Sequence, residues 1–229
     1  EDYAFENKEM NLVLFNDALE HVTKIHRILR FPRGSALLVG VGGSGKQSLT
    51  KLATFTASYK LSTINLTRNY KEDNFREDLM ELYKEVVNKQ TTFLFTDAHV
   101  VEEGFLELIN NMLTIGMIPG LFPEEEKDGL INEIEDAARK EGVPESKEAK
   151  WDYFVNKCRD NLHIVLAMSP AENKGEGQKD SLRVRCRNFP GLVSNTSIDW
   201  FFPWPKEALE AVATHFLKES DLPDELRNP

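Results

Sequence analysis

The stretch "GVGGSGKQSL", residues 40–49, decides the fold. A phosphate-binding P-loop has the pattern G-x-x-x-x-G-K followed by Ser or Thr. Here both glycines and Lys46 keep the spacing, while Gln47 stands where the hydroxyl residue is expected. A short apolar run at residues 35–39 precedes the loop, and a helical pattern at residues 46–58 follows it. Because strand, glycine loop and helix occur in this order, the sequence predicts a phosphate-binding loop rather than a chance glycine-rich turn.

Gln47 changes what such a loop is expected to do. Backbone N–H groups of the loop cradle phosphates, and Lys46 neutralises the β and γ oxygens. An amide is a poor ligand for Mg²⁺, which requires near-ideal octahedral geometry, although the adjacent Ser48 offers a hydroxyl if the helix start shifts. The sequence therefore predicts nucleotide binding with a weakened metal site. The candidate nucleotide-binding residues are Gly40, Val41, Gly42, Gly43, Ser44, Gly45, Lys46, Gln47 and Ser48.

Apolar runs alternate with amphipathic helical patterns along the rest of the chain. Strands are predicted at residues 35–39, 61–66, 92–96, 161–168 and 197–201. Helices are predicted at residues 16–30, 46–58, 73–87, 103–115 and 206–217. Parallel strands need crossover helices to return the chain, so this alternation predicts an α/β fold with a five-stranded parallel sheet covered on both faces.

The charge of the chain is acidic and concentrated in one segment. The 229 residues include 38 acidic and 28 basic residues, a balance that argues against nucleic acid as a partner, because polyanion binding depends on Lys and Arg. Ten acidic and four basic residues lie between Glu124 and Glu148. We interpret residues 122–150 as a solvated, acidic helical insertion into a single domain that spans residues 1–229.

The remaining composition excludes several classes of protein. Cys158 and Cys186 form no C-x-x-C pair, which is typical of a reducing compartment, and we expect both thiols to be buried and inert. The five histidines lack metal-ligand spacing. Apolar runs are shorter than the roughly 18 residues of a membrane span, so we expect a cytoplasmic protein with no membrane partner. The chain lacks an initiator Met, and we expect it to be a piece of a longer protein.

The stretch "FLFTDAHV", residues 93–100, supplies the second expected part of the site. P-loop NTPases place a magnesium-binding carboxylate at the end of such a strand, commonly followed by a Glu that orients water. If Asp97 is the magnesium carboxylate, Ala98 occupies the Glu position. If Asp97 stands at the Glu position, Thr96 has replaced the magnesium carboxylate. Either alignment leaves one carboxylate where hydrolysis needs two, and a capping role for Asp97 is the structural alternative.

Three arginines, Arg183, Arg185 and Arg187, are spaced two residues apart. In an extended segment this spacing would place all three side chains on one side. One of them could then act as an arginine finger that reaches the γ-phosphate of a neighbouring module. Ordinary surface ion pairs are the alternative interpretation.

Together with the P-loop, four longer segments carry a resemblance to a known family. They are "GFLELINNML" (104–113), "IPGLFP" (118–123), "RCRNFPGLV" (185–193) and "DWFFPWP" (199–205). Residues 9–217 resemble the fourth AAA+ module of dynein heavy chains, of the axonemal rather than the cytoplasmic branch. The segments are far more specific to this family than a P-loop is.

The resemblance implies a fold and a setting. It implies an AAA+ P-loop NTPase large α/β subdomain with sheet order 5-1-4-3-2, and a small helical subdomain and a microtubule-binding stalk beyond Pro229. Six AAA+ modules would form a ring within one heavy chain, with the first as the main ATPase and the second to fourth as nucleotide-binding regulators. The implied partners are the neighbouring AAA+ modules and, through the stalk, the microtubule. The implied location is the axoneme of a cilium or flagellum.

The resemblance also assigns residues to roles. It favours the alignment with Thr96 at the Asp position and Asp97 at the Glu position, and it places Ser169 at the sensor-one position, where Asn is usual. Arg187, or else Arg185, would be the finger that serves the preceding module in trans. Apolar residues at the start of the chain would run past the adenine ring, with core packing as the alternative: Leu12, Val13 and Leu14.

We therefore expect a regulatory module that binds ATP or ADP and hydrolyses it slowly or not at all. One alternative is an active ATPase that uses Ser48 and Asp97 to hold Mg²⁺. Another is a purely structural ring element with an empty P-loop. A P-loop kinase for a small molecule is disfavoured because the sequence has no acceptor-binding lid motif.

Overall fold

A computed structural model describes residues 3, 12–170 and 182–218 of the chain. The five strands are β1 (Ala36–Gly40), β2 (Lys60–Thr63), β3 (Thr91–Thr96), β4 (Leu162–Met168) and β5 (Ser197–Phe201). The larger helices are α2 (Asn16–Arg30), α3 (Lys46–Thr56), α4 (Glu72–Val86), α5 (Gly104–Thr114), α6 (Glu124–Lys140), α7 (Lys147–Asn161) and α10 (Lys206–Lys218). Shorter helical segments are the 3-10 turn η1 (Asp97–His99), α8 (Leu182–Asn188) and α9 (Gly191–Ser194). The predicted strands and helices are confirmed, although β2 ends three residues earlier than expected.

The five strands form one parallel sheet in the order β2-β3-β4-β1-β5, which confirms the predicted order. In register, Ala36 of β1 lies between Val165 of β4 and Ser197 of β5. The carboxyl ends of β3, β4 and β1 therefore meet at one edge of the sheet. Open parallel sheets bind ligands at this edge, and the glycine loop begins there.

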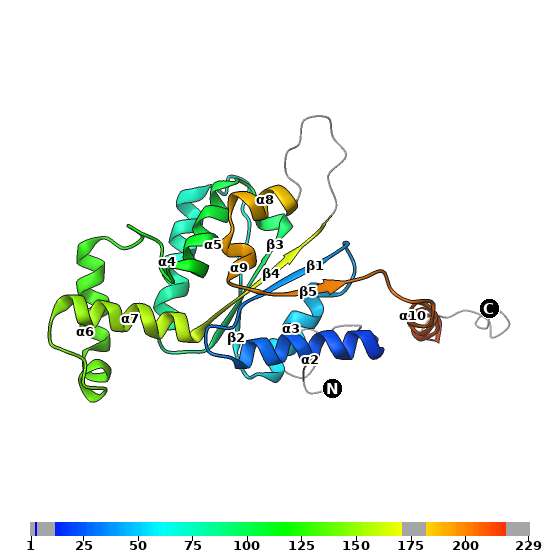
Figure 1. Ribbon diagram of the computed structural model, residues 1–229, viewed down its shortest axis with the longest axis horizontal. Coiled ribbons are helices and arrows are strands. Elements are labelled where there is room, and N and C mark those ends of the chain that lie inside the picture. Colours follow the sequence, from blue (N-terminus) through cyan, green and yellow to red (C-terminus); the bar gives the residue numbers. More distant parts are fainter. Residues whose placement is uncertain (1–2, 4–11, 171–181, 219–229) are drawn as a thin grey trace.

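Helices cover both faces of the sheet (Figure 1). Alternate residues of the central strands enter two separate apolar cores. On one side, Leu37 and Leu166 pack with α4, α5 and α7. On the other side, Leu38 and Val165 pack with α2 and α3. Because the strands are buried on both faces, their sequences are continuous apolar runs. The second core also packs α3 behind the glycine loop.

The acidic insertion contains two helices that contact each other and project beyond the end of the sheet, at the left of Figure 1. Its first helix is α6, and its second, α7, continues to Asn161 and passes directly into β4 without a loop. Lys150 joins the two helices. Its ammonium group lies 2.8 Å from Glu135 and 2.8 Å from Glu145, with only 11% of the side chain exposed. These ion pairs tie α7 to α6 and to the segment that connects the two helices.

The segment that carries the three arginines is helical, so the expectation that all three lie on one side was wrong. In an α-helix, residues two apart point about 200° away from each other. Arg185 accordingly faces inward, while Arg183 and Arg187, four residues apart, share the exposed face of α8.

Both cysteines are free thiols. Burial raises the pKa of Cys158 to about 12, which agrees with an inert core thiol. Cys186 on α8 is half-buried rather than buried, and burial raises its pKa as well. Among the residues described, there is no helix with the length and apolar character that crossing a membrane requires.

Candidate functional site

The glycine loop connects β1 to α3 and has the backbone geometry of an anion cradle. Gly43 and Gly45 adopt φ angles of +79° and +89°, a region that side chains disfavour. Beside Gly42 and Gly43, the position of an added Cβ has no neighbour within 4 Å, so the outside of the loop faces open space. The eleven-residue helix α3 begins immediately after the loop, and its N-terminus adds positive potential there.

A cavity of about 420 Å³ lies in front of this loop. The ends of β3 and β4 complete its wall. Its lining residues are Gly42, Gly43, Ser44, Gly45, Lys46, Gln47, Ser48, Thr96, Asp97, Ala98, Ala167 and Ser169. We call this cavity the phosphate pocket. It brings together the loop, Asp97 and Ser169, which the sequence had placed far apart.

Lys46 lies inside the loop rather than in solvent, with 8% of its surface exposed. Its ammonium group donates hydrogen bonds to the carbonyl oxygens of Gly40 at 2.5 Å and Val41 at 2.8 Å, and to Ser44 Oγ at 3.2 Å. Burial lowers the pKa of Lys46, and the charge of Asp97 opposes that shift. The loop therefore holds the lysine in place beside the open phosphate pocket.

Asp97 opens the turn η1 after β3, and both of its carboxylate oxygens have donors. Oδ1 accepts a hydrogen bond from Arg185 Nη1 at 3.0 Å. Oδ2 accepts one from the backbone N–H of Ser169 at 2.5 Å. On the other side of the turn, the Thr96 N–H donates to His99 Nδ1 at 3.1 Å, and burial lowers the pKa of His99. The carboxylate is thus fixed between β3, β4 and α8.

The residues around the phosphate pocket fit phosphate better than they fit magnesium. Gln47 is exposed, Ser48 is half-buried, and the oxygens of Asp97 already accept from Arg185 and from the backbone of Ser169. Across the residues that the structure describes, no group of three or more His, Cys, Asp or Glu side chains could hold a metal ion. Backbone N–H groups and Lys46, by contrast, are the donors that phosphate requires.

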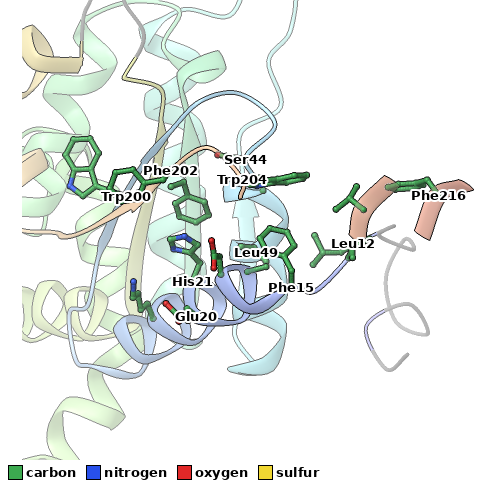
Figure 2. A pocket seen from close by; sticks show the side chains of 17 residues that line it. Leu12, Phe15, Glu20, His21, Ser44, Leu49, Trp200, Phe202, Trp204 and Phe216 are labelled. Carbon is green, nitrogen blue, oxygen red and sulfur yellow. The ribbon is translucent and has the colours of Figure 1, made fainter. Parts of the chain in front are cut away.

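A second, largely apolar cavity of about 350 Å³ opens beside the first. Figure 2 shows the side chains that reach it from the start of the described chain, α2, β5 and α10. Its main apolar and aromatic lining residues are Leu12, Val13, Phe15, Leu49, Trp200, Phe201, Phe202, Trp204, Val212 and Phe216. We call it the aromatic cleft. Leu12 and Val13 line this cleft, whereas Leu14 is 48% exposed and does not.

The inner wall of the aromatic cleft is rigid. The ring of His21 stacks on Phe201 with 3.9 Å between centroids and 12° between planes. His21 Nδ1 lies 2.6 Å from the carboxylate of Asp199, which is buried. Phe15 meets Trp204 edge to face at 5.3 Å. Flat aromatic walls of this kind suit a planar ring such as a nucleobase.

The two cavities meet at the glycine loop, because Ser44 and Gly45 line both of them. Below the loop, strands β1 and β5 are packed closely against each other. A Cβ added to Gly40 would lie 2.6 Å from the Cβ of Phe201, so β1 and β5 pack together only because residue 40 is glycine. One ligand with a planar ring at one end and phosphates at the other matches this arrangement.

Sequence reasoning did not assign the aromatic residues that follow β5 to this cleft. The segment at residues 199–205 has four aromatic residues among seven, which was a visible signal. Its contribution was missed because periodicity does not reveal which distant segment an exposed aromatic residue will face. The α10 residues Val212 and Phe216 were missed for the same reason.

The arginines divide into two kinds. Arg185 is bound to Asp97 of its own chain, and 16% of its side chain is exposed. Arg187 is exposed on the outer face of α8. The structure thus separates the two residues that the sequence had offered as alternatives.

Comparison with known proteins gives a consistent result. Residues 10–229 match the family described as "P-loop containing dynein motor region D4". The chain is 60% identical over 219 residues to the human dynein axonemal heavy chain 10, covering 95% of this chain and 5% of that protein. It is 60% identical over 227 residues to the Dynein-1-alpha heavy chain of the flagellar inner arm I1 complex of Chlamydomonas reinhardtii, covering 98% and 5%. It is 45% identical over 218 residues to the Dynein beta chain of the flagellar outer arm of the same alga, covering 94% and 5%. The chain therefore spans about 5% of the length of these relatives.

Proposed function

Because the chain belongs to the family of P-loop containing dynein motor region D4 modules, we propose that it binds ATP or ADP as a regulatory module of an axonemal dynein motor, with little hydrolysis of its own. In this proposal, residues 1–229 form the large α/β subdomain of the fourth AAA+ module. The neighbouring modules of the heavy chain are its direct partners, and the microtubule is reached only through the distant stalk. The location is the axoneme of a cilium or flagellum.

The observation that carries the proposal is the junction of the phosphate pocket and the aromatic cleft at Ser44 and Gly45. The adenine ring would lie among the aromatic residues, beside Leu12 and Val13. The phosphates would lie against the backbone N–H groups of residues 42–46, with Lys46 as the neutralising charge. Nucleotide bound in this way stabilises the folded module by mass action, whether or not it is hydrolysed.

Three features support slow hydrolysis. Gln47 removes the hydroxyl that normally binds Mg²⁺. Thr96 and Asp97 supply one carboxylate where two are usual, and that carboxylate is held by Arg185 and the backbone of Ser169. Ser169 itself replaces the Asn expected at the sensor-one position. Arg187 is the candidate finger for the preceding module in trans, because it is exposed.

Calorimetric titration with ADP and with ATP tests the proposal, using the unmodified chain and Lys46→Ala. Charge-assisted hydrogen bonds are worth roughly 1.5–3 kcal/mol, so we expect Lys46→Ala to weaken either nucleotide about 10- to 100-fold. Lys51→Ala is the matched control, because Lys51 lies on the same helix but lines neither cavity. A chain that binds neither nucleotide would refute the proposal.

An active ATPase is the second candidate, because Ser48 and Asp97 line the same pocket. It requires steady phosphate release that depends on Mg²⁺ and disappears in Lys46→Ala. We expect phosphate release at the background rate in both proteins. Release well above background in the unmodified chain would favour the active ATPase.

A further inference from the structure

Among the residues that the structure describes, Asp97 is the one acidic side chain that lines the phosphate pocket. An unneutralised carboxylate there would repel a polyphosphate, and P-loop sites normally remove that repulsion with a divalent cation. Here a guanidinium from the same chain already contacts the carboxylate, at 3.0 Å from Oδ1. We propose that Arg185 takes the place of the divalent cation as the counter-charge of Asp97, so that this module binds nucleotide without requiring magnesium. The inference rests on the proposed function.

The position of Arg185 is built into the fold. Leu182, Cys186 and Phe189 pack against the larger apolar core and anchor α8. Arg185 shares this inward face, because residues three and four apart lie together on a helix. The Phe189 N–H donates to the carbonyl of Arg185 at 2.8 Å and closes the helix end. The Arg185 guanidinium therefore contacts Asp97 from a helix that is held in place by the core.

Each oxygen of the carboxylate already accepts a hydrogen bond. Oδ1 accepts from Arg185 and Oδ2 accepts from the backbone N–H of Ser169 at 2.5 Å. A Mg²⁺ ion bound to Oδ1 would share that oxygen with the guanidinium, whose positive charge opposes its binding. The pair is partly sheltered, with 16% of the arginine and 39% of the aspartate side chain exposed, so solvent and salt screen it incompletely.

Among the described residues, the charged side chains at the phosphate pocket carry a net positive charge without a metal. Lys46 and Arg185 carry two positive charges, and Asp97 carries one negative charge, so the side chains leave one positive charge for the phosphates. Loss of Arg185 would leave Lys46 facing Asp97 alone, with no net charge, and would free Oδ1. A divalent cation would then be needed to hold both the carboxylate and the phosphates. Arg185 does not line the pocket, so it acts through Asp97 as a positioning residue.

The test compares ADP dissociation constants in excess Mg²⁺ and in excess EDTA for the unmodified chain, Arg185→Ala and Arg183→Ala. For the unmodified chain we expect the two constants to agree within about two-fold. For Arg185→Ala we expect ADP binding in EDTA to weaken about 10-fold, because a hydrogen-bonded charge is removed, and Mg²⁺ to restore most of the loss. Arg183→Ala, the matched control at an exposed position of α8, should behave as the unmodified chain does.

Arg185→Gln keeps much of the stem that packs α8 while it removes the charge, and it serves if the alanine variant is unfolded. We expect it to show the same dependence on Mg²⁺. If the Arg185 variants bind ADP equally with Mg²⁺ and with EDTA, the inference is overturned while nucleotide binding stands. A strong magnesium dependence in the unmodified chain also overturns it. If the unmodified chain binds no ADP in either condition, the proposed function fails, and the inference fails with it.

Discussion

The phosphate pocket and the aromatic cleft meet at two residues but are built from different material. The pocket lies at the ends of three central strands. These strands are fixed on both faces by the two apolar cores. The cleft is made of side chains from an edge strand and from α10, which an extended segment carries away from the sheet (Figure 1). Several of its aromatic residues are exposed, including Phe202 at 73% and Trp200 at 52%. The pocket that we propose for phosphate is therefore fixed by the fold, whereas the cleft that we propose for the base depends on peripheral segments.

The largest loss of stability is expected at the contact between β1 and β5, which supports both the pocket and the cleft. In Gly40→Ala, the added Cβ would lie 2.6 Å from Phe201 Cβ and 2.7 Å from its carbonyl oxygen, so β1 and β5 must separate. Overpacking of this kind costs about 1–3 kcal/mol. We expect that loss in the free energy of unfolding, measured with urea. We also expect weaker ADP binding, because the carbonyl of Gly40 accepts from Lys46.

Gly42→Ala is the matched control for this prediction. Gly42 lies in the same loop, yet its added Cβ would meet nothing within 4 Å. We expect its free energy of unfolding to stay within about 0.5 kcal/mol of the unmodified value. If the two variants lost the same free energy of unfolding, the contact between β1 and β5 would not be what supports the two regions.

A smaller effect should separate the two regions. Trp204 lines the cleft and meets Phe15 edge to face, and aromatic stacking on a base is worth roughly 1–3 kcal/mol. We expect Trp204→Ala to weaken ADP binding about 10-fold and to leave inorganic tripolyphosphate binding unchanged. Calorimetry with both ligands would measure this.

Phe31→Ala controls for the loss of an aromatic residue. Phe31 is 65% exposed and lies outside the cleft, so we expect both ligands to bind as they do to the unmodified chain. If Trp204→Ala weakened tripolyphosphate as much as ADP, the division into a base region and a phosphate region would be wrong.

The smallest expected effect is a change in the stability of the fold with pH. It should not depend on the pocket or the cleft. Burial lowers the pKa of His163, whose ring contacts the Gly34 carbonyl and Gln90 at the opposite end of β4 from the site. Burial also lowers the pKa of His99. Folded chains therefore keep these rings neutral while unfolded chains take up protons below about pH 6.5. The stability that the folded chain gains from keeping these rings neutral is present above that pH and is lost as the pH falls.

We accordingly expect the urea midpoint to fall between pH 7.5 and pH 5.5, by less than Gly40→Ala lowers it. His163→Gln should flatten this dependence if the variant folds, because it removes one of the two groups. A midpoint that rose as the pH fell over this range would show that the rings are charged in the folded chain.

Much of the fold could be predicted from the sequence because its signals are local. The parallel sheet follows from short apolar runs such as residues 92–96 and from the helices between them. The loop at residues 40–46 was recognised because its spacing is a short-range constraint. The order of the strands came from the resemblance, since periodicity alone does not order a sheet.

The partners of the site residues could not be predicted, because they are distant in sequence. Asp97 meets the backbone of Ser169, 72 residues away, and Arg185, 88 residues away. The arginine spacing was interpreted for an extended segment, and the helix reversed that interpretation by turning Arg185 inward and Arg187 outward. The resemblance grouped Leu14 with Leu12 and Val13, but it does not show which of three neighbouring side chains face the cleft, and Leu14 is 48% exposed outside it.

The direct passage from α7 into β4 has a mechanical consequence. Because Asn161 ends the helix and the next residue begins the strand, no loop residue separates α7 from β4. The 15 residues of α7 are about 22 Å long, and its buried residues Phe154 and Cys158 pack it against the larger apolar core. A displacement of α7 would therefore act directly on β4, the middle strand of the sheet. The opposite end of that strand is followed by Ser169, whose N–H donates to Asp97, so α7 and the phosphate pocket are connected through a single strand.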